Sequence, residues 1–210
     1  MNFGFGRHIA CLILLLLVAF TTFVGSNAQT SAAAQSKDDG IDPTYTQLAA
    51  KCAQLQAQTA DPKQRVSACQ DAAAEADRLP DTSEYVQRTR AYVAYANALI
   101  RSSQPQAAIS VGEKAIAVVK QGHGDDAGSS AAYQVTGEAR ALTGDFAGAD
   151  EDLSVAENYE RKAIAGAAGS SSKSYTQTLK DMLHFHSQVL YALGKQAAAQ
   201  AKIQEADRLS

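Results

Sequence analysis

Apolar residues recur at helical spacing through most of residues 41–210, and short polar breaks separate these stretches. The clearest example is residues 91–119, where two apolar helices flank a break at 102–105. Small residues occupy three positions there, Ala96, Ala108 and Ala115, spaced by twelve and then seven. The same spacing recurs at Gly137, Ala149 and Ala156, at Ser187, Ala199 and Ala206, and more loosely at Ala57, Cys69 and Ala76. Because small residues let helices approach closely, the pattern predicts stacked helical hairpins.

Prolines, glycines and capping residues predict where the helices begin and end. Asp42-Pro43 and Asp61-Pro62 each combine a cap with a proline in the first turn, and Asp81 with Glu84 resembles a capping box. Glycine- and serine-rich segments at 121–130 and 166–172 are expected to be loops. The predicted helices are 43–59, 62–79, 81–102, 105–120, 131–142, 146–165, 175–193 and 195–209. Short turns within each pair predict an all-α fold of about four antiparallel hairpins.

Residues 1–28 are predicted to be a secretory signal peptide. Arg7 precedes an apolar run from residue 9 to 20, and 26–28 offer small residues for cleavage. The alternative is an uncleaved membrane anchor, but the apolar stretch 9–24 is shorter than the roughly 20 residues that span a bilayer. We therefore expect an exported protein, periplasmic or secreted, with no membrane association after cleavage. Residues 29–40 are predicted to be a flexible leader, and 41–210 the helical domain.

Cleavage would leave two cysteines, Cys52 and Cys69, and an even number in an exported chain suggests a disulfide. A hairpin that turns near residues 60 and 61 places the two cysteines opposite each other. The repeat spacing conflicts with this register, since pairing Ala57 with Cys69 moves the turn toward Lys63. We give the turn signal precedence and predict the bond. Two thiols without convenient histidines predict no metal site, and no Cys-x-x-Cys motif indicates redox catalysis.

Residues 142–149 (LTGDFAGA), followed by Ala156, and 193–199 (LGKQAAA), followed by Ala206, resemble the tetratricopeptide repeat. Ala108-Ile109 and 114–116 look like the same helix in an earlier unit, with Ser103 in place of the turn glycine and Gly112 where the family has a large side chain. Ala108, Ala149 and Ala199 lie 41 and 50 residues apart, against a usual repeat of about 34. The resemblance implies a right-handed solenoid, a TPR-like α-α superhelix, whose concave face binds peptides or protein segments.

The resemblance also implies which side chains would line that groove. They are Arg90, Val93, Asn97 and Arg101 in the second unit, Gln134 and Glu138 in the third, and Asp181, His184 and Gln188 in the fourth. Arg90, Asn97 and Arg101 share one helical face and could hold a carboxylate or backbone carbonyls of a peptide. The alternative interpretation is that all of these are solvated polar positions on amphipathic helices.

Charge and motif content narrow the function classes. A net charge of −3 without a Lys/Arg-rich run argues against nucleic acid as a partner. His184 and His186 are two apart on a helix and cannot share a metal, and no phosphate loop or nucleophile motif is present, so we expect neither enzymatic activity nor a cofactor. The sequence thus predicts an exported scaffold that binds a protein or peptide. The alternative is a structural role, by self-association into a homo-oligomer or as a membrane-tethered assembly factor.

Overall fold

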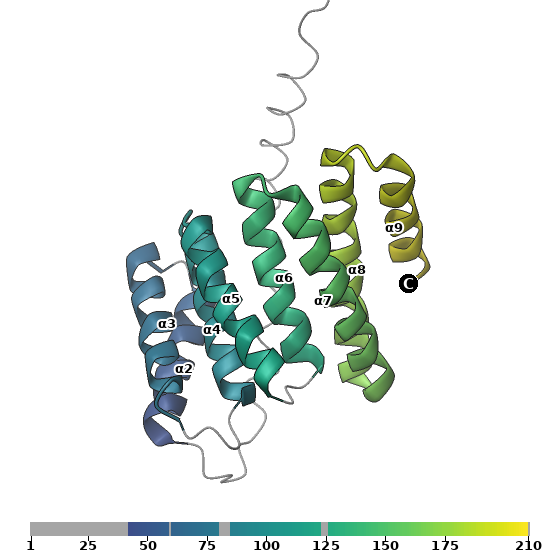
Figure 1. The fold of residues 1–210 in the computed structure, drawn as a ribbon. Helices are drawn as coiled ribbons and strands as arrows, with labels where there is room; N and C mark the ends of the chain where they lie inside the picture. Colours follow the sequence, from purple (N-terminus) through teal and green to yellow (C-terminus); the bar gives the residue numbers. More distant parts are fainter. Residues whose placement is uncertain (1–41, 59, 80–84, 123–125, 210) are drawn as a thin grey trace, which may run out of the picture. The chain divides into compact units, whose positions relative to one another are not determined.

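A computed structural model describes residues 42–58, 60–79, 85–122 and 126–209, which all belong to one compact unit. Within these ranges the chain forms eight helices and no strand, so the all-α prediction is confirmed (Figure 1). The helices are α2 (Pro43–Ala57), α3 (Pro62–Ala76), α4 (Tyr85–Arg101), α5 (Pro105–Gln121), α6 (Asp126–Thr143), α7 (Phe146–Gly166), α8 (Ser170–Ala192) and α9 (Gln196–Arg208). The predicted signal peptide, the leader and the Asp81/Glu84 cap lie outside the described residues.

The starts of α2, α3 and α7 are fixed by aspartate caps. Asp42 Oδ1 accepts hydrogen bonds from the backbone N–H groups of Thr44 at 2.6 Å and Tyr45 at 3.2 Å. Asp61 Oδ1 and Asp145 Oδ1 accept from the second or third helical residue in the same way, at 2.7 and 3.0 Å. These bonds satisfy amides that have no partner inside the helix, so the predicted Asp-Pro starts of α2 and α3 are confirmed.

Three hairpins, α4–α5, α6–α7 and α8–α9, turn by the same backbone path. One or two residues after the first helix ends, the chain has a residue with positive φ: Ser103 at 59°, Gly144 at 88° and Gly194 at 74°. In each turn the next amide, of Gln104, Asp145 or Lys195, donates to the carbonyl five residues earlier at 2.9 Å. This is the Schellman bond that closes a helix C-terminus. Ser103 therefore adopts the glycine conformation, and the first of these turns is as tight as the others.

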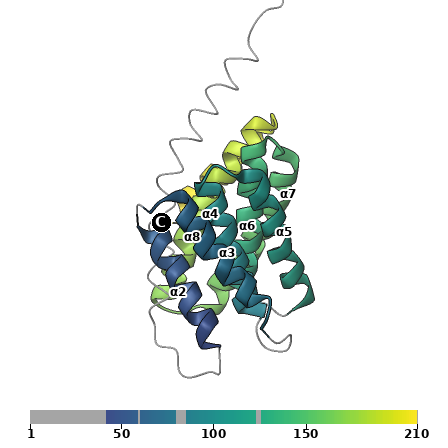
Figure 2. The same cartoon turned by 90° about the vertical axis from the view of Figure 1, so that its left-hand side faces the viewer.

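Each helix packs against the next along the chain, and α2, α4, α6 and α8 also contact one another in succession. Figure 2 views the same helices from the side of α2 and α3. The small residues of the repeat spacing are buried where neighbouring helices approach: Ala96, Ala108, Ala115, Ala149, Ala156, Ala199 and Ala206 are all 0 % exposed, and Gly137 and Ser187 are also buried. A Cβ on Gly137 would lie 3.0 Å from Leu153 Cγ, which shows how closely α6 and α7 pack.

The first hairpin follows the register of its turn and not that of the repeat. Cys52 on α2 and Cys69 on α3 are bonded, with their Sγ atoms 2.08 Å apart and their Cα atoms 4.7 Å apart, so the predicted disulfide is confirmed. Ala57, which the looser copy of the spacing placed against Cys69, is exposed. That copy is therefore wrong in α2, because the bonded pair Cys52 and Cys69 fixes the α2–α3 alignment and leaves Ala57 at the surface.

Two predicted loops are shorter than expected. α6 already begins at Asp126, inside the predicted loop 121–130, because Ser129 and Ser130 are buried and Ser130 Oγ donates to the carbonyl of Ala156 on α7 at 3.0 Å. α8 begins at Ser170 and not near residue 175. Its serines and threonines bond to their own helix, as in Thr176 Oγ1 to the Ser172 carbonyl at 2.8 Å. Packing and local bonds here outweigh the weak helix propensity of serine.

Candidate functional site

The predicted binding residues of α4 divide into two groups. Asn97 is half-buried and has no hydrogen-bond partner among the described residues, while Val93 packs beside it against the main core. Arg90 is exposed. Arg101 is also exposed, but its Nη1 donates at 2.8 Å to the carbonyl of Gln56 at the end of α2. Burial and the neighbouring Arg65 lower the pKa of Arg101. Arg101 thus joins α4 to α2, and a peptide ligand would have to compete for it.

On α6, the predicted pair Gln134 and Glu138 is half-buried and internally bonded. Gln134 Nε2 donates to Glu138 Oε1 at 2.9 Å. Burial raises the pKa of Glu138, and the hydrogen bond from Gln134 opposes that rise only in part. A carboxyl group with a raised pKa gains from any ligand that supplies a hydrogen-bond donor or a positive charge.

On α8, Asp181 is exposed and its Oδ1 accepts from Gln177 of the same helix at 2.8 Å. The side chains of His184 and Gln188 are half-buried and, within residues 42–209 as far as the structure describes them, have no hydrogen-bond partner. Because α4 contacts α6 and α6 contacts α8, the half-buried members of the predicted set lie on neighbouring helices. We call them the α4–α6–α8 row: Val93, Asn97, Gln134, Glu138, His184 and Gln188.

A buried charge network that the sequence did not reveal joins α7, α8 and α9. His186 is 1 % exposed, and its Nδ1 and Nε2 lie 2.6 Å from Glu157 Oε1 and 2.7 Å from Asp150 Oδ1. Glu157 also accepts from Lys202 of α9, and Asp150 from Lys195 at 2.5 Å. Burial alone would raise the pKa of both carboxyls, but the bonds from His186 and the two lysines hold them below their usual values. The network fixes the last hairpin against α7.

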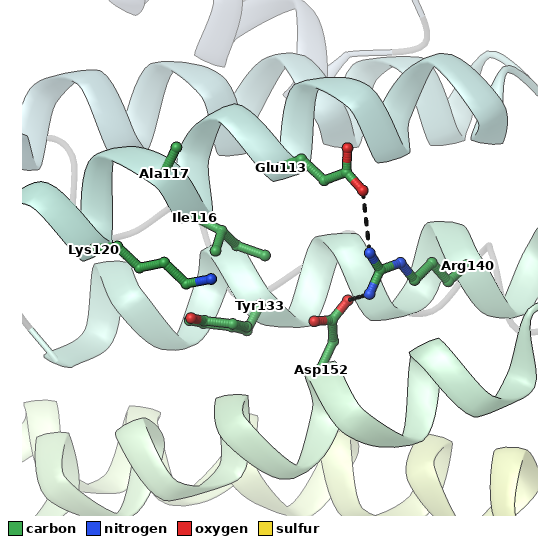
Figure 3. A pocket seen from close by; sticks show the side chains of 7 residues that line it. All are labelled: Glu113, Ile116, Ala117, Lys120, Tyr133, Arg140 and Asp152. Carbon is green, nitrogen blue, oxygen red and sulfur yellow. Dashed lines mark hydrogen bonds and ion pairs between the residues drawn. The ribbon is translucent and has the colours of Figure 1, made fainter.

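A second unpredicted feature is a pocket of about 330 Å³ between α5, α6 and α7 (Figure 3). Its lining residues are Glu113, Ile116, Ala117 and Lys120 from α5, Tyr133 and Arg140 from α6, and Asp152 from α7. Arg140 bridges two of the acids, since its Nη2 lies 3.1 Å from Glu113 Oε1 and its Nη1 lies 2.7 Å from Asp152 Oδ2. No spacing within one segment could indicate this pocket, because three helices contribute to it.

Comparison with known protein families, characterised proteins and solved structures yields no match. In the part of the chain that the structure describes, no three His, Cys, Asp or Glu side chains gather where they could hold a metal ion. None of the helices in those ranges combines the length and hydrophobicity needed to cross a bilayer. The disulfide is compatible with an oxidising, exported location.

Proposed function

We propose that this protein is an exported, TPR-like scaffold whose hairpins stack as a right-handed solenoid and whose α4–α6–α8 row binds a segment of a partner protein. One observation carries the proposal. The row places half-buried polar groups on three neighbouring helices, and the side chains of Asn97, His184 and Gln188 have no hydrogen-bond partner among the described residues. Half-buried polar groups lose part of their hydration without a compensating bond, so a peptide backbone that supplied one would be favoured.

Three further features support a repeat scaffold. The α4–α5, α6–α7 and α8–α9 hairpins share one turn geometry, one spacing of buried small residues, and contacts between successive first helices. In repeat proteins of this kind each unit contacts mainly its neighbours, and the row of first helices supplies a continuous binding surface. The resemblance to the tetratricopeptide repeat rests on the same turns and small residues.

The test is affinity purification of partners with variants chosen from the row. Asn97→Ala and Gln188→Ala remove polar groups of the row without touching the core, whereas Arg101→Ala would also disturb α2. Gln106→Ala and Asn158→Ala are matched controls, because both side chains are exposed and without a partner in the described structure. We expect the row variants to lose a partner that the control variants retain. Equal recovery by all four variants would refute the assignment of the row.

The structural alternative is tested by light scattering of the purified protein over a range of concentrations. A partner-binding scaffold is expected to keep a constant mass. A mass that rises with concentration would instead favour self-association as the function, provided that substitutions in the row do not alter that rise.

A further inference from the structure

The pocket between α5, α6 and α7 contains a buried carboxyl group with one unused oxygen. Asp152 is 7 % exposed, and its Oδ2 accepts from Arg140. Its Oδ1 has no partner within the described residues, and Figure 3 shows this oxygen directed toward Tyr133, into the pocket. This oxygen is open to the pocket, where it can accept a hydrogen bond from a ligand.

The charges around Asp152 indicate what kind of donor fits. Burial is the main reason that the pKa of Asp152 is raised to about 6. Arg140 opposes this rise, whereas the acidic Glu151, Glu113 and Asp145 increase it. The surroundings of this carboxyl are therefore negative on balance, because the one nearby cation, Arg140, is already paired with Glu113, Asp145 and Asp152 itself. A ligand ammonium group could donate to Asp152 Oδ1 and would offset the excess negative charge around it.

The other end of the pocket is positive. Lys120 of α5 is exposed, and its ammonium group forms no ion pair with any residue that the structure describes. Figure 3 shows its side chain extending over the pocket beside Tyr133. A ligand carboxylate would therefore find its counter-ion at this end.

Between the two ends the pocket wall is apolar. The ring of Tyr133 is held in place by stacking on Tyr159, with centroids 6.0 Å apart, and Ile116 faces the pocket from α5. An aliphatic chain can lie on this wall, and an ammonium group placed over the face of the Tyr133 ring would gain a cation–π attraction. The volume of about 330 Å³ is at the lower end of the range for small-molecule sites, so the ligand is small.

We propose that this pocket binds a small zwitterionic amino acid, whose ammonium group donates to Asp152 Oδ1 and whose carboxylate pairs with Lys120. The lining already balances two acids, Glu113 and Asp152, with two bases, Lys120 and Arg140. A simple anion or a simple cation would upset that balance, whereas a zwitterion matches both ends. This inference does not depend on the proposed partner-binding function, because the α4–α6–α8 row shares no residue with the pocket.

The experiment is a titration of the full-length, ¹⁵N-labelled protein at pH 7.5, followed by amide chemical shifts. The probes are 3-aminopropanoate, 4-aminobutanoate, 5-aminopentanoate and 6-aminohexanoate, with butylamine and butanoate as single-charge controls. We expect at least one amino acid to saturate amides of the pocket residues with a Kd of about 1 mM or below. Each single-charge control should bind about tenfold more weakly, since it satisfies only one end.

Substitutions test which charged group of the ligand each end of the pocket binds. Asp152→Asn and Lys120→Met should each weaken the best amino acid about tenfold, the size of one lost charge-assisted bond. Asp71→Asn and Lys173→Met are the matched controls, because both side chains are exposed and lie outside the pocket. They should bind like the unaltered protein.

A change of pH tests the pairing of the ligand ammonium group with Asp152 without a substitution. Because the ammonium group pairs with the ionised carboxyl, protonation of Asp152 below about pH 6 weakens binding. At pH 5 only about one-tenth of this carboxyl stays ionised, so the affinity should fall about tenfold. The titratable and charged groups around it are Arg140, Glu113, Lys120 and Tyr133 in the pocket, and Glu151 and Asp145 nearby. The proposal is overturned if no amino acid saturates, if butanoate or butylamine binds equally well, or if neither Asp152→Asn nor pH 5 lowers the affinity.

Discussion

Gly112 is the position where an added methyl group would most clearly disturb the packing of two helices. A Cβ built on Gly112 of α5 would lie 2.3 Å from Thr136 Oγ1, 3.2 Å from its Cβ and 3.4 Å from its Cα. Ordinary contacts between carbon atoms are about 3.5–4.0 Å. Thr136 is 0 % exposed, and its hydroxyl donates to the Ala132 carbonyl at 2.8 Å, so it cannot turn aside freely. Gly112→Ala must therefore separate α5 from α6 or break that bond.

The expected cost follows from three contributions. Overpacking a closely packed site costs about 1–3 kcal/mol, and loss of the Thr136 hydrogen bond adds about 1 kcal/mol. Replacing glycine by alanine inside a helix returns about 1 kcal/mol. The net loss is about 1–3 kcal/mol, which lowers the Tm of a domain of this size by roughly 2–12 °C.

The assay is thermal unfolding followed by circular dichroism. Gly166→Ala is the matched control, because nothing lies within 4 Å of its added methyl group, and its Tm should stay constant or rise slightly. The double variant Gly112→Ala/Thr136→Ala should be more stable than the sum of its single changes by about 1 kcal/mol, because the closest clash, with Thr136 Oγ1, is gone. A Gly112→Ala variant as stable as the unaltered protein would refute the close approach of α5 and α6.

Three further predictions concern the turn, the disulfide and the charge network. Ser103→Gly should stabilise the protein by about 1 kcal/mol, since φ is 59° there, whereas Ser110→Gly, inside α5, should destabilise it by a similar amount. The midpoint of urea unfolding measures both changes. A lower midpoint for Ser103→Gly would contradict the left-handed turn. Reducing the Cys52–Cys69 bond, which spans 17 residues, should cost about 3 kcal/mol, and identical urea midpoints with and without reductant would exclude the bond. The Glu157 and Asp150 carboxyls have lowered pKa values, so their contribution is complete above about pH 4.3 and is lost as the pH falls through the still lower folded-state values. Glu157→Gln should therefore cost about 1–3 kcal/mol at pH 7, and the difference from the unaltered protein should shrink toward pH 3, so a pH-independent difference would show that ionisation is not involved.

The hairpins were predictable because their signals are local. Asp42-Pro43, Asp61-Pro62, Gly144 and Gly194 act through bonds within a few residues of themselves, and these predictions are confirmed. The disulfide was predictable for the same reason, since the turn at 60–61 alone aligns Cys52 with Cys69. Where a short segment sets the geometry, a short segment suffices to predict it.

Predictions failed where distant helices decide the outcome. Residues 126–130 resemble a loop, but α7 buries Ser129 and Ser130 and keeps the segment helical. The spacing of His184 and His186 bears only on metal binding, whereas the carboxylate partners of His186, Asp150 and Glu157, come from another helix. The pocket around Asp152 depends on three helices at once. The acidic character of Asp152 does not indicate a site, because the helix dipole favours acidic residues near any helix N-terminus.

Site-specific photo-crosslinking tests the central claim, that the α4–α6–α8 row holds a partner, most directly. A photoreactive side chain is placed at Asn97 or Gln188 in the native cell, and at the exposed control positions Gln106 and Asn158. We predict that the two row positions crosslink to one and the same protein and that the control positions do not. Crosslinks that are equally frequent at all four positions, or that form only between two copies of this chain, would contradict the scaffold function.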